Sequence, residues 1–353
     1  MSLQSFLLNS LIRGSIKSPA VMGLFKNRAV PADLGIAGAR PVIDDLIARY
    51  ARTPSFVDIR HVDAGGVDAE WVRLPKSDKS KVLVYLHGGA YFFGSPDTHR
   101  NLVWRLAAKA GCRVLCVNYR LAPEHPYPAA VEDAYAVYNW LLAQGFDPGS
   151  IAMAGDSAGG GLTFATMAKL RDEGVPLPSC AVGLSPWTDL AVTGPSMRTN
   201  ARRDPMFDPG AIPRAVDMYL QGADPYDPYA SPLYADATGM PPTLIQVGST
   251  EILLDDARRL AHNFREAGVD VKLRVYQGVP HVWQVLTPLI PEARTAVNEI
   301  GAFLKAHMGV EQAIGIKTAQ VTSLADRRRN NLEGRAPSRH GLAREPLPDS
   351  VEG

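Results

Sequence analysis

The amino-acid sequence predicts an α/β fold in which helices cover both faces of a mostly parallel sheet. From residue 81 onward, short apolar segments alternate with segments of helical periodicity, and this alternation is typical of a parallel sheet. Residues 81–86 are almost continuously apolar, as expected of a strand that is buried on both faces. With 353 residues and 46% apolar residues, the chain is long enough for one large domain or two average ones.

The predicted elements follow one another in a regular order. Residues 1–30 are apolar and basic, which favours an amphipathic helical arm over a transit peptide or a membrane-surface helix. A short helix is predicted at 41–50, and strands at 57–62 and 67–74 are predicted to form an antiparallel hairpin around Gly65 and Gly66. Further strands are predicted at 81–86, 113–117, 151–154, 180–184, 243–247 and 271–276, and helices at 98–110, 129–143, 162–171, 256–267 and 292–307.

Two regions depart from this alternation. Residues 190–242 are rich in proline and contain one predicted helix, at 212–220, so we expect them to form a lid or cap above the sheet. The tail from Lys317 onward is polar and lacks periodicity, and we predict that residues 317–353 are disordered.

Composition and charge exclude several classes of function. The net charge of +1 gives no electrostatic basis for binding nucleic acid. No apolar run approaches the ~18 residues that span a bilayer, so no transmembrane segment is predicted. Cys112 and Cys116 fall four residues apart on one predicted strand, too far apart for a disulfide, and the only other cysteine is Cys180. This sparse set suits a reducing compartment and predicts a cytoplasmic protein, and neither His nor Cys has the spacing of metal ligands.

A glycine-flanked serine lies between a predicted strand and a predicted helix. Gly155 and Gly159 each stand two residues from Ser157, where larger side chains would clash in a tight strand-to-helix turn. Such a turn exposes the serine above the end of the strand, beside the backbone N–H of Ala158 at the start of the helix. This context predicts that Ser157 is a nucleophile.

A second glycine-rich stretch follows the strand predicted at 81–86. In His87-Gly88-Gly89, the glycines allow neighbouring backbone N–H groups to point toward one position. Such donors stabilise the oxyanion of a tetrahedral intermediate, and losing one typically lowers the rate by roughly 100- to 1,000-fold.

Candidates for the general base and the acid follow in the order serine, acid, histidine. Of the eight histidines, only His281 follows a core strand on the C-terminal side of Ser157. Glu251 is predicted in the loop after the strand at 243–247, where open α/β sheets collect active-site groups. Asp255 is the alternative acid, but it precedes the helix predicted from Asp256, where aspartate usually caps free N–H groups. The spacing therefore favours Glu251.

Together these motifs resemble the hormone-sensitive-lipase family of α/β hydrolases, in its branch of mostly microbial esterases and lipases. The resemblance covers roughly residues 40–310 and includes His87-Gly-Gly-Ala90, Gly155-Asp-Ser-Ala-Gly159 and residues 118–128 with Glu132-Asp133. It implies an α/β-hydrolase fold with an eight-stranded sheet in a single domain, 1–316, with a cap built from 1–50 and 190–222. It also implies an oxyanion hole of Gly88, Gly89 and Ala158, and hydrolysis without a metal or other cofactor. The chain departs from most members at Glu251, where they carry aspartate.

We therefore predict a serine carboxylic ester hydrolase that acts on small-molecule esters with short- to medium-chain acyl groups, through an acyl-enzyme intermediate. Ser157, His281 and Glu251 are the expected triad. A non-catalytic small-molecule receptor on the same fold is one alternative, against which His281 argues. An amidase or acyltransferase with the same triad is another, because specificity depends on pocket shape. The sequence does not identify the natural ester or its stereochemistry, and it leaves a homodimer open.

Overall fold

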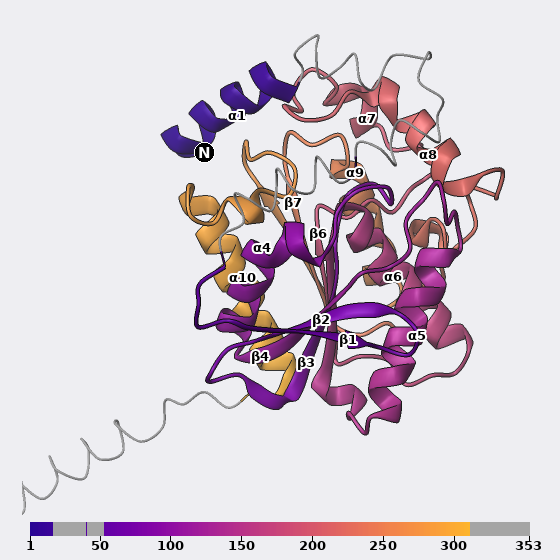
Figure 1. Ribbon diagram of the computed structural model, residues 1–353. Helices are drawn as coiled ribbons and strands as arrows, with labels where there is room; N and C mark the ends of the chain where they lie inside the picture. Colours follow the sequence, from indigo (N-terminus) through magenta and orange to yellow (C-terminus); the bar gives the residue numbers. More distant parts are fainter. Residues whose placement is uncertain (17–39, 41–52, 311–353) are drawn as a thin grey trace, which may run out of the picture. The chain divides into compact units, whose positions relative to one another are not determined.

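An eight-stranded sheet forms the core of the protein in a computed structural model that describes residues 1–16, 40 and 53–310 (Figure 1). The strands lie in the order β1-β2-β4-β3-β5-β6-β7-β8; β1 and β2 are antiparallel to their neighbours, and β3 to β8 run parallel. This confirms the mostly parallel sheet predicted from the sequence. The strands are β1 Asp58–Asp63, β2 Asp68–Arg73, β3 Asp78–Leu86, β4 Cys112–Val117, β5 Ile151–Asp156, β6 Cys180–Leu184, β7 Thr243–Gly248 and β8 Val271–Tyr276.

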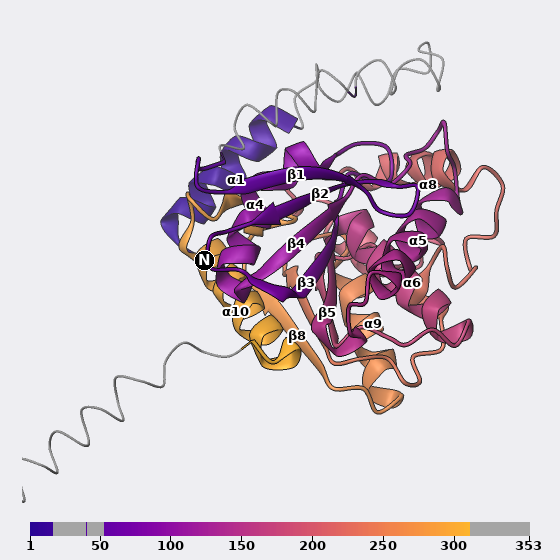
Figure 2. The same ribbon diagram turned by 60° about the horizontal axis from the view of Figure 1, so that its bottom comes forward.

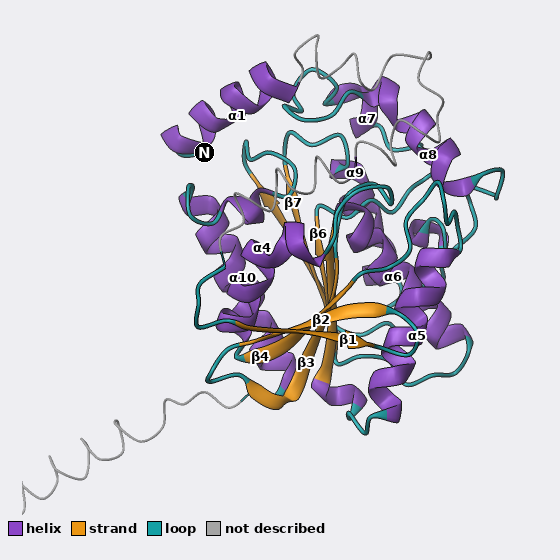
Figure 3. Ribbon diagram, in the orientation of Figure 1, coloured by secondary structure: helices purple, strands orange, loops and turns teal. Residues whose placement is uncertain are grey.

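Helices cover both faces of the sheet, as Figures 1 and 3 show. One face is covered by α4 (Pro96–Ala110) and α10 (Pro291–Met308), whose buried side chains share a core with β3 and β4. The other face is covered by α5 (Ala129–Ala143), α6 (Ser157–Asp172) and α9 (Leu254–Glu266). In the turned view of Figure 2 the strands fan out between these two layers. The central strands β5, β6 and β7 are buried along their whole length, which explains why their sequences are mostly apolar.

Some predicted boundaries needed correction. Helix α9 begins at Leu254, two residues before its predicted start. The region 190–242 contains α8 (Ile212–Leu220), as predicted, but also α7 (Ser196–Thr199), which is too short to show helical periodicity. The helix predicted at 41–50 and the tail at 317–353 lie outside the described residues, and the predicted domain boundary at 316 lies there as well.

The N-terminal arm forms α1 (Leu3–Ile16), and its first turn contacts the start of α10. The hydroxyls of Ser2 and Ser5 each donate a hydrogen bond of 2.9 Å to the carboxylate of Glu292. Within the described ranges, no helix has the length and apolar character needed to cross a membrane. All three cysteines are buried and free, and Cys112 and Cys116 share β4 as predicted.

The parallel arrangement determines where the candidate residues meet. Parallel strands end at one edge of a sheet, so the loops after β3, β5, β7 and β8 all leave from the same edge. In this order, the four loops carry the glycines of the predicted oxyanion hole, Ser157, Glu251 and His281. The segment with α7 and α8 lies at this end as well, next to the loop after β7 (Figure 1).

Candidate active site

Ser157 occupies a strained turn at the junction of β5 and α6. Strand β5 ends at Asp156 and the helix begins at Ser157, whose φ of 53° lies in the left-handed region that non-glycine residues rarely adopt. A Cβ built on Gly155 would collide with backbone atoms of Gly159, and one built on Gly159 would collide with the carbonyl oxygens of Leu86 and His87. The two glycines therefore allow the close packing that the sequence predicted for this turn.

Glu251 and His281 come together at the edge of the sheet. The distance between Nδ1 of His281 and Oε2 of Glu251 is 2.6 Å, and the two side chains are 4% and 0% exposed. Nε2 of His281 is buried and has no hydrogen-bond partner among the described residues. Glu251 thus holds the imidazole by Nδ1 and leaves Nε2 available to exchange a proton. Within the described chain no hydrogen bond joins His281 to Ser157, and such bonds commonly tighten only when substrate binds.

The second oxygen of Glu251 is also bound. Oε1 accepts hydrogen bonds from the hydroxyl of Ser185 (2.8 Å) and from the N–H of Gly248 (2.5 Å). Complete burial raises the pKa of Glu251, and the adjacent His281 and the two donors oppose that rise. The hydroxyl of Ser185 also accepts the N–H of Val282, next to His281, at 3.3 Å. Ser185 was not identified from the sequence, although it directly follows β6 at the same sheet edge.

Asp255, the alternative acid, has a different set of partners. It lies inside the first turn of α9, where its carboxylate accepts the N–H of Ser196 (2.8 Å) and pairs with Arg258 (3.3 Å). The predicted cap was therefore wrong: the N-cap residue is Leu253, because the helix begins earlier than expected. In the described part of the chain, Asp255 makes no hydrogen bond to His281.

The glycine-rich loop after β3 faces the serine turn. The N–H of Gly88 donates a 3.0 Å hydrogen bond to Oδ1 of Asp156, which also accepts the hydroxyl of Tyr85 at 2.7 Å. Burial acts to raise the pKa of Asp156, but the nearby His99 and the Tyr85 hydroxyl hold it below its ordinary value. The expectation that Gly88 is an oxyanion donor therefore needs correction, because its N–H already has an acceptor.

Three other backbone N–H groups remain as candidate oxyanion donors beside Ser157. Gly89 (φ 122°) and Ala90 (φ 56°) both have left-handed backbone, and neither N–H has an acceptor within the described chain. The N–H of Ala158 lies in the first turn of α6, where helical N–H groups lack intrahelical partners. These three groups form a candidate oxyanion hole.

Aromatic side chains connect the cap segment, the part of the predicted cap at residues 190–222, to the site. The ring of Phe207 packs edge-to-face on His281, with 4.7 Å between ring centroids. Tyr219 of α8 stacks on Tyr91 of the glycine-rich loop, with centroids 3.8 Å apart and planes 5° apart. The segment predicted as a cap thus contacts both the base and the oxyanion loop.

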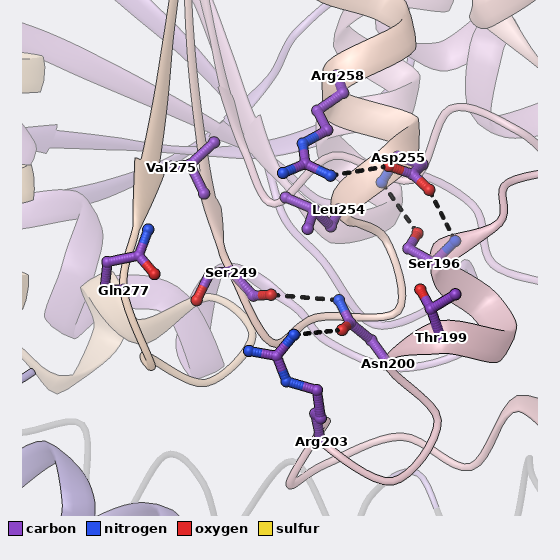
Figure 4. Close-up of a pocket in the computed structure, with 10 residues that line it drawn as sticks. All are labelled: Ser196, Thr199, Asn200, Arg203, Ser249, Leu254, Asp255, Arg258, Val275 and Gln277. Carbon is purple, nitrogen blue, oxygen red and sulfur yellow. Dashed lines mark hydrogen bonds and ion pairs between the residues drawn. The ribbon is translucent and has the colours of Figure 1, made fainter.

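Residues on either side of Glu251 in the chain, Ser249 and Leu254, line a polar cavity of about 290 Å³ (Figure 4). Asn200 and Ser249 line it, and Figure 4 shows the hydrogen bond between them. Neither Ser157 nor His281 lines this cavity, so it is separate from the reacting groups.

Comparisons with known proteins identify the family. Residues 83–285 match a family model described as having the alpha/beta hydrolase fold. An acetyl-hydrolase of Streptomyces hygroscopicus is 48% identical over 248 residues, which cover 70% of this chain and 83% of the relative. An esterase of Acinetobacter venetianus is 36% identical over 299 residues, which cover 84% and 95%. The crystal structure of an esterase from the bacterial hormone-sensitive lipase family has 42% identity and a TM-score of 0.79, covering 87% of this chain and 99% of that one. The chain therefore belongs to the hormone-sensitive-lipase family of α/β hydrolases.

Proposed function

We propose that this protein is a serine carboxylic ester hydrolase in which Ser157 is the nucleophile, His281 the general base and Glu251 the triad acid. The observation that carries the proposal is the buried 2.6 Å pair of Glu251 and His281 at the same sheet edge as the strained Ser157. A single strained serine has several explanations. A strained serine together with an oriented imidazole and N–H groups without acceptors has the arrangement of an acyl-transfer site.

The first half of the reaction forms the acyl-enzyme. Oγ of Ser157 attacks the ester carbonyl carbon while Nε2 of His281 takes the hydroxyl proton. The carbonyl oxygen becomes an oxyanion, and the N–H groups of Gly89, Ala90 and Ala158 donate hydrogen bonds to it. When the intermediate collapses, the bond to the alkoxy group breaks and His281 returns the proton to the departing alcohol.

The second half regenerates the enzyme. His281 takes a proton from a water molecule, whose oxygen attacks the acyl carbon. The second tetrahedral intermediate then releases the carboxylic acid and Ser157 recovers its proton. In both halves the carboxylate of Glu251 keeps the imidazole in the required tautomer and stabilises the imidazolium that forms. Its bonds from Ser185 and Gly248 keep it oriented toward His281.

Short- to medium-chain acyl esters are the proposed substrates. Aromatic rings of the predicted cap lie against the site: Phe207 packs on His281, and Tyr219 stacks on Tyr91. Rings in these positions favour short acyl groups over long ones. A crystal of EstE5, which is 38% identical to this chain, was soaked with p-nitrophenyl butyrate, and another relative is named an acetyl-hydrolase. Butyryl and acetyl groups are both short, which supports short acyl groups in the substrates of this protein.

The proposed compartment is the cytoplasm. Three buried, free cysteines suit a reducing environment, because secreted proteins more often carry paired cysteines. Activity-based labelling of fractionated cells would test this, since recovery of the labelled protein outside the cytoplasmic fraction contradicts the proposal.

Rapid-mixing kinetics with p-nitrophenyl esters, from acetate to dodecanoate, tests the function and the chain-length preference together. An acyl-enzyme mechanism in which deacylation is slower predicts a burst of p-nitrophenol stoichiometric with the protein, followed by turnover. Rates should be highest for the shorter acyl chains and fall toward dodecanoate. Saturable binding without release of p-nitrophenol would instead identify a receptor, and preferential cleavage of anilides would identify an amidase.

A further inference from the structure

The loop that carries Glu251 is held by two buried side chains from the cap segment between α7 and α8. Nδ2 of Asn200 donates to the carbonyl oxygens of Glu251 (2.8 Å) and Ser249 (3.2 Å), the second of which appears in Figure 4. Oδ2 of Asp204 accepts the N–H of Ile252 at 2.9 Å. Asn200 is 3% exposed and Asp204 is 0% exposed. Cap side chains therefore bind the backbone at Glu251 and on both sides of it.

The other oxygen of Asp204 reaches toward the base. Oδ1 accepts the N–H groups of Met206 (2.8 Å) and Phe207 (3.0 Å) and so fixes the turn that carries Phe207. The ring of Phe207 packs edge-to-face on the imidazole of His281, with an angle of 67° between the planes. One carboxylate therefore contacts the backbone beside the triad acid and also orients the aromatic ring that contacts the triad base.

The chemistry of these contacts requires a carboxylate. An ionised carboxylate accepts hydrogen bonds at both oxygens, whereas an amide accepts at one side and donates at the other. With asparagine at position 204, an NH₂ group would face either Ile252 N–H or the N–H groups of Met206 and Phe207. A buried N–H without an acceptor is unfavourable, so the loop or the turn would move to find another partner.

Resting on the triad roles proposed above, we infer that Asp204 is a positioning residue that couples the cap segment to both the acid and the base, with Asn200 as a second anchor of the acid loop. Catalytic geometry is sensitive at this scale, since a displacement of about 1 Å costs on the order of 100-fold in rate. The triad then reaches its working geometry only when the cap segment is in place, so the cap takes part in catalysis as well as in substrate selection.

The Asp204→Asn variant tests this inference against a matched control, Asp224→Asn. Asp224 forms a comparable turn by accepting the N–H of Tyr226 at 2.9 Å, but it is exposed and has no contact with the triad loops among the described residues. Three readouts are compared: kcat and KM on p-nitrophenyl butyrate, the far-downfield proton NMR signal of the His281–Glu251 hydrogen bond, and the circular dichroism spectrum.

We expect Asp204→Asn to lower kcat on the order of 100-fold, with KM within a few-fold of the wild type, and to shift or broaden the downfield signal. Asp224→Asn should match the wild type in all three readouts. Wild-type kcat in Asp204→Asn, or a raised KM with unchanged kcat, would overturn the inference, because the residue would then only support the fold or shape the pocket.

If Asp204→Asn does not fold, Asn200→Ala carries the test. This variant removes the donor to the Glu251 and Ser249 carbonyls and should lower kcat by about 10-fold at unchanged KM. Unchanged kcat would overturn the coupling between cap and triad. Labelling of the wild-type protein by a fluorophosphonate is run in parallel, since failure of that reaction contradicts the proposed function itself, independently of the positioning role.

Discussion

Replacing Glu251 with glutamine tests the assignment of the triad acid, because the surrounding donors determine how the amide must lie. Oε1 of Glu251 faces two donors, the Ser185 hydroxyl and the Gly248 N–H. In Glu251→Gln the amide oxygen therefore stays on that side, and the NH₂ group faces His281. Nδ1 of His281 then has to accept a hydrogen bond, which places the ring proton on Nε2. That tautomer cannot take a proton from Ser157.

The magnitude follows from this change of tautomer. The pair is fully buried, so water cannot replace the lost carboxylate, and the imidazolium formed in the reaction loses its counter-charge. The same kind of substitution in a serine protease lowers kcat about 10⁴-fold. We therefore expect kcat to fall by roughly 10³- to 10⁴-fold, equivalent to about 4–5.5 kcal/mol of transition-state stabilisation. The fold should persist, because glutamine has the same shape.

The assay compares Glu251→Gln with Asp255→Asn. Initial rates on p-nitrophenyl butyrate give kcat, and urea unfolding gives the free energy of unfolding. Asp255→Asn should keep kcat within a few-fold of the wild type and lose about 1 kcal/mol of stability, since asparagine still accepts the Ser196 N–H but no longer pairs with Arg258. The opposite pattern, a large rate loss in Asp255→Asn and a small one in Glu251→Gln, would refute the assignment.

Two further predictions concern residues around the triad. Ser185→Ala removes the 2.8 Å donor to Glu251 and should lower kcat by about 10- to 100-fold, the equivalent of one hydrogen bond to a charged group. The control is Ser179→Ala, which removes hydrogen bonds to the Ile151 carbonyl and to Sγ of Cys180 and touches no triad residue. Equal rates in both variants would contradict this role. Burial lowers the pKa of His87 from 6.5 to about 3. Between these two pH values the unfolded chain binds more protons than the folded protein, so the free energy of unfolding falls as the pH falls. His87 contributes up to about 1.4 kcal/mol per pH unit to this slope. Urea unfolding at several pH values should show a shallower slope for His87→Asn, and an identical slope would contradict the buried, neutral histidine.

Much of the fold was predictable because its pattern is local. The predicted ranges of α5, α8, β6 and β8 agree with the structure to the residue, since each is bounded by a change of periodicity or by a glycine. The approach of Glu251 and His281 was predictable for a different reason. Parallel strands end at one edge, so residues directly after β7 and β8 must lie close together.

Other parts of the site depend on contacts that no local pattern encodes. The direction of the Gly88 N–H is determined by Asp156, a residue far away in the sequence, so the glycine run alone could not show which N–H groups stay free. The capping role predicted for Asp255 was wrong because α9 begins at Leu254, earlier than the periodicity of the sequence indicates. Asp255 therefore lies inside the helix. Asn200 and Asp204 lie in an irregular segment, where a buried polar side chain looks the same in sequence as a solvated one.

Mass spectrometry after reaction with a fluorophosphonate shows whether Ser157 is the nucleophile that forms the covalent acyl intermediate. We expect one adduct per wild-type chain, located on the peptide that contains Ser157, together with complete loss of esterase activity. Ser157→Ala should remain unlabelled and should turn over p-nitrophenyl butyrate on the order of 10⁶-fold more slowly, with its fold intact. An adduct on another serine, or esterase activity that survives in Ser157→Ala, would show that Ser157 is not the nucleophile.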